Sequence, residues 1–243
     1  MFGDARIELL NAKTGKTLTI DTMTDGKMKL TIDSVFPMVY LLNISWDREF
    51  VTQTEMRLMN KYQEQGMPTY QLQRVLYLAP SEQSHYHIRL NEPASQQDIE
   101  ASYQARDPRI RLVLDKASGK NVRLQEDMET LYFQAQSDFF HQKDSLSNLM
   151  YACIDASDRT QAGALNRQIS SLWQRNMLPW LSRKQDEFIS AHPDSPISAY
   201  LLYNRVLNIE DFKTYRHLYD KLTPEAKNNP FGRELMYYEE KLK

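Results

Sequence analysis

The 243-residue sequence has almost no cysteine and no excess of either charge. Its one cysteine, Cys153, excludes an intrachain disulfide, a CxxC redox pair and a zinc site built from several thiolates. Thirty basic and thirty-two acidic side chains give a net charge of -2, so no electrostatic attraction draws the chain to nucleic acid or anionic lipid. We therefore expect no nucleic-acid partner.

Long apolar runs are missing as well. No stretch approaches the roughly 20 apolar residues that a membrane-spanning helix needs, and residues 1–4 have neither a basic start nor the apolar core of a secretory signal. Strand-like alternation begins almost at once, at Ile7 and Leu9, so we expect that upstream residues have been removed. A hydrophobic share of 41% nevertheless predicts one large or two modest folded domains with real cores.

The first part of the chain shows the two-residue period of β-strands. Even positions from Leu18 to Ile32 are mostly apolar around Thr24-Asp25-Gly26, which predicts a β-hairpin that buries Leu18 and Ile20 and turns at the Asp-Gly pair. Both faces are apolar in "VYLLNISW", which predicts a central strand within 35–46. Further strands are predicted at 74–79, 85–90 and 109–115, and a less regular excursion at 47–70. Residues 1–116 are thus predicted to form an antiparallel β domain.

After Asp115 the period changes to 3.6 residues, and the joint is predicted at Lys116–Lys120, which contains Ser118-Gly119. Residues 117–243 are predicted to form an all-helical domain. Within it, residues 146–154 carry five apolar side chains on one helix face, which predicts a buried stripe. These are Leu146, Leu149, Met150, Cys153 and Ile154. The predicted fold class is α+β, an antiparallel β-sandwich-like domain followed by helices.

Proline and capping residues predict how the helices are connected. In "FISAHPDSPISAYLLY", residues 188–203, Pro193 ends one helix, Asp194 or Ser195 caps the next, and Pro196 suits its first turn. Thr223-Pro224 and Asn229-Pro230 repeat this pattern, so we expect helices of roughly 12 residues stacked by short connections. Pro179 should kink or divide its helix.

Two residue types are candidate metal ligands or nucleophiles. His85 and His87 lie two apart on a predicted strand and point to one face, as metal ligands can, yet no third ligand has a recognisable spacing. The alternative is a solvated strand face, with Tyr86, Ile88 and Leu90 on the buried side. Cys153 lies in an apolar stripe, where a free cysteine packs as a small hydrophobe, so we favour packing over nucleophilic catalysis.

Aromatic and acidic clusters are the remaining candidates. Trp173 and Trp180, with Tyr237 and Tyr238, are able to line a groove for a peptide or glycan, although aromatics at helical spacing more often form a core. Two acidic pairs, Glu239 with Glu240 and Asp98 with Glu100, lack the geometry of an acid-base pair. No GxSxG, Walker, HExxH or GxGxxG motif occurs. We predict no catalytic, cofactor-binding or metal-binding residue.

The order of these segments resembles the N-terminal β domain and helical segment of TlpA/ResA-type envelope thiol-disulfide oxidoreductases of Bacteroidetes. Five stretches carry the resemblance: "NAKTGKTLTIDTMTDGKMKL", "PMVYLL", "LYLAPSEQSHYHIRL", "FISAHPDSPISAYLL" and "LYDKLTPEAKNNPFGREL". The hairpin around Asp25-Gly26-Lys27 and the joint from His192 to Ser195 are its most characteristic parts. In that family a thioredoxin-like domain with a CxxC motif follows, and this chain ends at Lys243 before any such domain, so no catalytic residue is carried over.

The resemblance implies a periplasmic or outer-envelope protein, expected to be a lipoprotein without its leader. Our first hypothesis is a non-catalytic module that positions a redox domain or binds a client protein. The alternative is a stand-alone envelope lipoprotein that binds a peptide or glycan in an aromatic groove between the two halves. We expect a protein partner, no cofactor and no transmembrane segment, and the sequence indicates no particular small-molecule ligand.

Overall fold

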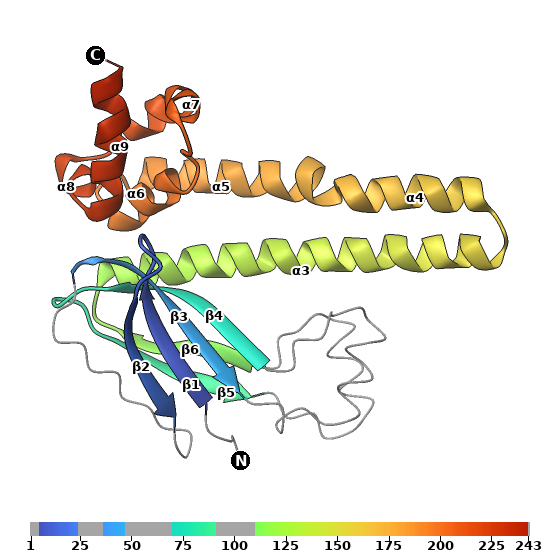
Figure 1. Ribbon diagram of the computed structural model, residues 1–243, viewed down its shortest axis with the longest axis horizontal. Helices are drawn as coiled ribbons and strands as arrows, with labels where there is room; N and C mark the ends of the chain where they lie inside the picture. The colour runs from blue at the N-terminus through green and yellow to red at the C-terminus, as the bar shows by residue number, and fades with distance from the viewer. Residues whose placement is uncertain (1–4, 24–35, 47–69, 91–109, 243) are drawn as a thin grey trace.

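The computed structural model describes residues 5–23, 36–46, 70–90 and 110–242 (Figure 1). Four antiparallel strands form one sheet in the order β2-β1-β3-β4, and two more form a second sheet. Their bounds are β1 Ala5–Asn11, β2 Thr17–Met23, β3 Met38–Trp46 and β4 Tyr70–Leu78, then β5 Ser84–Leu90 and β6 Ile110–Ala117. The predicted α+β class, with antiparallel sheets before helices, is confirmed, and β3 is a central strand as predicted.

Helices make up the rest of the described chain. Their bounds are α3 Lys120–Asp155, α4 Arg159–Leu172, the π-helical turn η2 Trp173–Met177, α5 Leu178–Ala191, α6 Pro196–Tyr203, α7 Ile209–Tyr219, α8 Pro224–Lys227 and α9 Pro230–Lys241. The strand-to-helix joint falls between Ala117 and Lys120, where the change of period predicted it.

Sheets and helices share one apolar core. Ile7, Leu9 and Ile44 of the four-stranded sheet lie in the same cluster as Leu202 and Phe231 of the helices, and all are fully buried. As Figure 1 shows, α6 to α9 gather at one end of the sheets, beside the start of α3. The C-terminal helices therefore contribute to the fold of the whole body and not only to a separate helical unit.

The predicted burial of Leu18 and Ile20 is wrong. Leu18 is 41% exposed and Ile20 is 56% exposed. Strand β2 pairs with β1, with Ile20 opposite Glu8, so both apolar side chains lie on the outer face of the sheet. Period-two alternation fixes which residues share a face, but not which face the core covers. The predicted Asp-Gly turn and its second strand, like the 47–69 part of the excursion, lie outside the described residues.

A short turn joins β1 to β2. Gly15 has a φ of +68°, a backbone region that glycine enters without steric cost. The side-chain Oδ1 of Asn11 accepts hydrogen bonds from the N–H groups of Lys13, at 2.9 Å, and Thr14, at 3.1 Å. This turn reaches the C-terminal helices, because Lys13 Nζ lies 2.6 Å from Glu234 Oε1 on α9.

The prediction of helices of roughly 12 residues is wrong for α3, which has 36. No glycine or proline occurs between Lys120 and Asp155, so nothing in this stretch ends a helix. The prediction suits the later helices better, such as α9 with 12 residues, whose Phe231 and Leu235 are fully buried.

Pro179 divides its helix as predicted. The π-helical turn η2 precedes it, and the N–H of Leu178 bonds the carbonyl of Trp173, five residues back. A proline has no N–H to donate to the preceding turn, and the wider π-turn accommodates that gap in the hydrogen-bond ladder. The returning chain therefore keeps one direction through α4, η2 and α5 (Figure 1).

Candidate functional site

A long helical hairpin is the most prominent feature of the described chain. Helix α3 runs away from the sheets, and α4, η2 and α5 return beside it (Figure 1). At 1.5 Å per residue, the 36 residues of α3 span about 54 Å. We call residues 138–175, the part farthest from the sheets, the distal hairpin.

The turn of the hairpin is built by local backbone chemistry. Ser157 takes a φ of 61°, which ends α3. The backbone N–H of Asp158 then donates to the carbonyl of Cys153 at 2.8 Å. In addition, the carboxylate of Asp158 accepts from Gln161 N at 3.0 Å and so caps α4. The chain therefore reverses within three residues, without glycine or proline.

The distal hairpin buries one seam and leaves apolar side chains outside it. Ala162 and Leu165 of α4 are buried. On α3, by contrast, the predicted stripe is only partly covered, because Leu149 is 57% exposed and Ile154 is 51% exposed. The prediction of a buried stripe over 146–154 is therefore wrong for these two positions. A two-helix hairpin has one contact line, so residues that flank the line remain in solvent.

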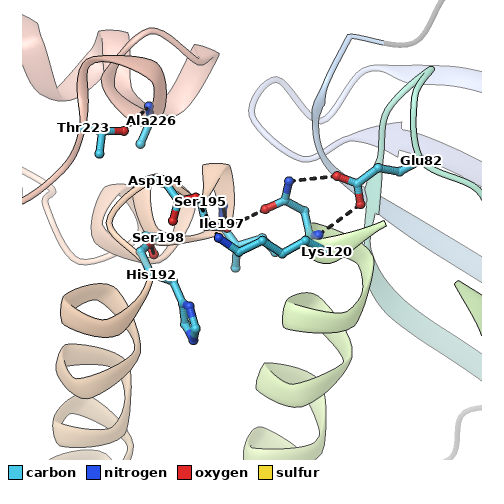
Figure 2. A network of polar contacts seen from close by, with 10 residues as sticks. Glu82, Lys120, His192, Asp194, Ser195, Ile197, Ser198, Thr223 and Ala226 are labelled. Carbon is cyan, nitrogen blue, oxygen red and sulfur yellow. Dashed lines mark hydrogen bonds and ion pairs between the residues drawn. The ribbon is translucent and has the colours of Figure 1, made fainter. Parts of the chain in front are cut away.

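The base of the hairpin is held by a carboxylate from the β4–β5 turn (Figure 2). Glu82 Oε2 accepts hydrogen bonds from the first backbone N–H groups of α3, those of Asn121 at 3.0 Å and Val122 at 3.1 Å. Its Oε1 accepts from Asn121 Nδ2 at 2.9 Å. A carboxylate at this position also interacts favourably with the helix dipole. A Cβ at Gly119 would lie 1.7 Å from Glu82 Oε2, so only glycine leaves room for the cap.

The same base is tied to the joint between α5 and α6. Ser195 Oγ donates to Asn121 Oδ1 at 2.9 Å and accepts from Ile197 N at 3.2 Å, so Ser195, rather than Asp194, is the helix cap (Figure 2). Asp194 instead accepts from Lys120 Nζ at 2.7 Å. This hydrogen bond from Lys120 lowers the pKa of Asp194. We call Glu82, Asn121, Ser195, Lys120 and Asp194 the polar joint.

Neighbouring groups extend the polar joint to the sheet and to α8. Tyr77, 3% exposed on β4, has its pKa raised to about 12, first by burial and then by the charges of Glu82 and Glu225. The N–H of Thr223 donates to the carbonyl of Pro193 at 3.0 Å. Thr223 and Asn229 cap α8 and α9, as predicted from the proline pattern.

A partly buried ionic cluster fixes the first turns of α3 on the sheets. Arg74 Nη2 of β4 lies 2.6 Å and 2.7 Å from the two carboxylate oxygens of Glu126, and its Nη1 donates to the carbonyl of Leu112 at 3.2 Å. Glu129, about one helical turn after Glu126, has its pKa raised by burial, which outweighs the opposing effect of Arg74. One guanidinium nitrogen of Arg74 thus contacts both oxygens of Glu126, and this charge-assisted contact holds that face of α3 toward β4.

His85 and His87 are both exposed, on the outer face where the solvated-strand interpretation placed them. His87 Nδ1 lies 2.7 Å from Asp115 Oδ1 on β6. Within the described part of the chain, no group of three His, Cys, Asp or Glu side chains has the geometry of a metal site. Ile88 and Leu90 belong to β5, but their side chains lie outside the description.

The other candidate residues lie apart from one another. Cys153 is half-buried at the far end of α3, and Trp173 and Trp180 are half-buried on the returning arm. The Trp173 ring packs edge-on against Phe139, with centroids 5.1 Å apart. Both tryptophans therefore belong to the hairpin, whereas the predicted groove lay between the two halves of the chain.

Among the predicted acidic pairs, only Glu239 and Glu240 lie in the described chain. Glu239 accepts from Tyr219 Oη at 2.9 Å, while Glu240 is exposed. The groups that organise the site, Glu82 and Arg74, are not among the predicted site residues. Their partners lie 39 and 52 residues away in sequence, and no local period connects such positions.

None of the helices in the described ranges has both the length and the apolar character to cross a membrane. Comparison of the chain with protein-family models, curated proteins and solved structures finds no match.

Proposed function

We propose that this chain is a non-catalytic protein-interaction module of the cell envelope. It holds the helical hairpin at a fixed angle to the sheets and offers the distal hairpin to a protein partner. The observation that carries this proposal is the exposure of Leu149 and Ile154 at the end of a hairpin about 54 Å long. The resemblance to TlpA/ResA-type proteins supports the envelope setting and a role in positioning a redox domain or binding a client.

The base of the hairpin supports a presenting role. Glu82, Arg74 and Lys120 connect α3 to the β4–β5 turn, to β4 and to the α5–α6 joint through charge-assisted hydrogen bonds. Such contacts keep the direction of α3 defined, whereas among the described residues the distal hairpin packs on its own second arm. A defined base with an apolar end suits a module that meets a macromolecule at a distance from its own body.

Site-specific photo-crosslinking tests the interaction. A photo-reactive amino acid replaces Leu149 in cells that produce the chain natively, and adducts are identified by mass spectrometry. We expect a discrete protein adduct from position 149. The same amino acid at Lys213, an exposed position on α7, is the matched control and should yield none. Equal labelling at both positions would remove the basis of the proposal.

The non-catalytic part has its own test. The chain should not accelerate the reduction of insulin by dithiothreitol, because its one cysteine cannot form the intramolecular disulfide of a CxxC cycle. The Cys153→Ser variant is the control. Acceleration well above that control would contradict the proposal.

A further inference from the structure

The two arms of the hairpin carry opposite charges. From Lys120 to Asp155, helix α3 has six acidic and three basic side chains. The returning arm has no acidic residue from Arg159 to Gln185, and it has five basic ones. These are Arg159, Arg167, Arg175, Arg183 and Lys184. One arm is thus acidic and the other basic over most of the hairpin.

Charges of opposite sign lie at matching levels along the arms. Asp155 and Arg159 flank the turn, and Asp138 and Arg175 lie about equally far from it on the two arms. All four side chains are exposed. None of them forms an ion pair in the part of the chain that the structure describes. The hairpin therefore has complementary charges that its own fold leaves in solvent.

A second copy of this chain matches that pattern. Two-fold symmetry makes an interface self-complementary, so that α3 of each copy meets the returning arm of the other. If both hairpins point the same way, the acidic arm α3 of one copy faces the basic returning arm of its neighbour. The opposite orientation would place acidic α3 against acidic α3, which like-charge repulsion disfavours.

We infer that the partner of the distal hairpin is a second copy of this chain, with which it forms an antiparallel four-helix bundle. This inference rests on the proposed interaction function and names its partner. Leu149 lies beside the seam of the single hairpin, and a second hairpin packed on that face gives it an apolar surface to pack against. Ile154, five residues further on and about 140° around the helix, lies on the other side of the seam. The charges select the partner and its orientation, and the apolar face around Leu149 supplies the contact area.

A charge-exchange experiment tests the inference by light scattering coupled to gel filtration. The first variant, Asp138→Lys with Asp155→Lys, makes both arms basic, and the second, Arg159→Glu with Arg175→Glu, makes both arms acidic. We expect the unaltered chain to have twice the mass of one copy at micromolar concentration. Each variant alone should dissociate at least about tenfold more readily, and an equimolar mixture of the two should regain the double mass.

The two substitutions beside the turn are chosen so that they do not destabilise the helices. A lysine at the last residue of α3 and a glutamate at the first residue of α4 both suit the helix dipole. The control pair, Lys16→Glu with Lys116→Glu, changes two exposed charges on the strand side of the molecule and should leave the mass unchanged. Circular dichroism at 222 nm verifies that each variant is folded. If one is not, Leu149→Lys replaces it and should likewise yield single copies.

Either of two results would overturn the inference. One is an unaltered chain that remains a single copy up to millimolar concentration, and the other is a mixture of the two charge variants that does not associate. An adduct at position 149 with a different protein, and none with the chain itself, would also overturn it while leaving the proposed interaction function standing. An absence of any adduct at that position would contradict the proposed function itself.

Discussion

At the scale of single residues, Glu82 makes the contact on which the direction of α3 depends. Its carboxylate accepts hydrogen bonds from two backbone N–H groups at the start of that helix, and Glu82→Ala removes the acceptor for both. We expect the free energy of unfolding, measured by urea titration, to fall by about 1–3 kcal/mol. Glu82→Gln keeps an acceptor oxygen and should lose less.

A substitution at Gly119 tests the same helix cap by displacing the Glu82 carboxylate rather than removing it. An alanine there directs its Cβ at the Glu82 carboxylate, although the backbone of Gly119, at φ -105° and ψ 151°, is open to any residue. Gly119→Ala should therefore destabilise the protein about as much as Glu82→Ala does. In the Glu82→Ala background it should cost little, so the double-mutant cycle will be strongly non-additive. Additive losses would show that Gly119 acts through some other contact.

Glu129 predicts a dependence of stability on pH. Burial raises its pKa above the ordinary 4.5, so the folded state loses stability as the pH rises from that value through the folded pKa. Glu129→Gln removes the charge, and its urea midpoint relative to that of the unaltered protein should rise between pH 4 and pH 7. Glu126→Gln, which breaks the pair with Arg74, is the contrast and should cost about 2 kcal/mol at pH 7. A fall in the relative midpoint of Glu129→Gln at pH 7 would contradict the burial argument.

At the scale of elements, the turn of the hairpin depends on one strained residue. Ser157 holds a left-handed backbone that glycine adopts freely and a β-branched residue resists. Ser157→Gly should leave stability unchanged or raise it by up to about 1 kcal/mol, and Ser157→Val should lower it by more than about 1 kcal/mol. Thermal unfolding of the two variants, followed at 222 nm, provides the comparison. Equal melting temperatures would show that the turn is free to change its conformation.

The sequence predicted elements well where local chemistry decides them. The joint at Pro193, the caps Thr223 and Asn229, and the break before Pro179 all follow from missing N–H groups and short polar side chains. The exposure of Ile20 and of Leu149 was not predictable in this way. Amphipathic periods place residues on one face, but the elements that cover that face come from distant parts of the chain.

Ser195 of the polar joint was predicted as a possible helix cap, but the contacts that link this joint to Glu82 escaped prediction for a related reason. Glu82 lies in a β-turn, where a polar residue is expected on local grounds alone, and its role comes from the helix that the fold brings beside it. The hairpin itself is a product of composition, since α3 contains no glycine or proline that would end it before Asp155. The candidate interface on the distal hairpin therefore results from the length of α3 and not from a sequence motif.

At the scale of the whole molecule, stability is expected to be uneven. The body has a continuous core of sheet and helix residues, while in the part of the chain that the structure describes the distal hairpin packs as two helices. Hydrogen exchange should be slowest in β1, β3 and α6 and fastest at residues 142–160. If two copies associate, protection at 142–160 will increase with protein concentration and protection in β3 will not. Protection at the hairpin end that is independent of concentration and equal to that of β3 would contradict both expectations.

The length of α3 makes the direction of its base important. Over the length of α3, about 54 Å, a change of about 5° in direction at the base, where the polar joint and the Arg74–Glu126 pair hold the helix, would carry the far end sideways by about 5 Å, roughly the width of a side chain. A small change in the direction of α3 at its base is therefore enough to misalign a surface that meets its far end. The position of the distal hairpin is consequently determined by the contacts at the base of α3, far from the surface that would meet a partner.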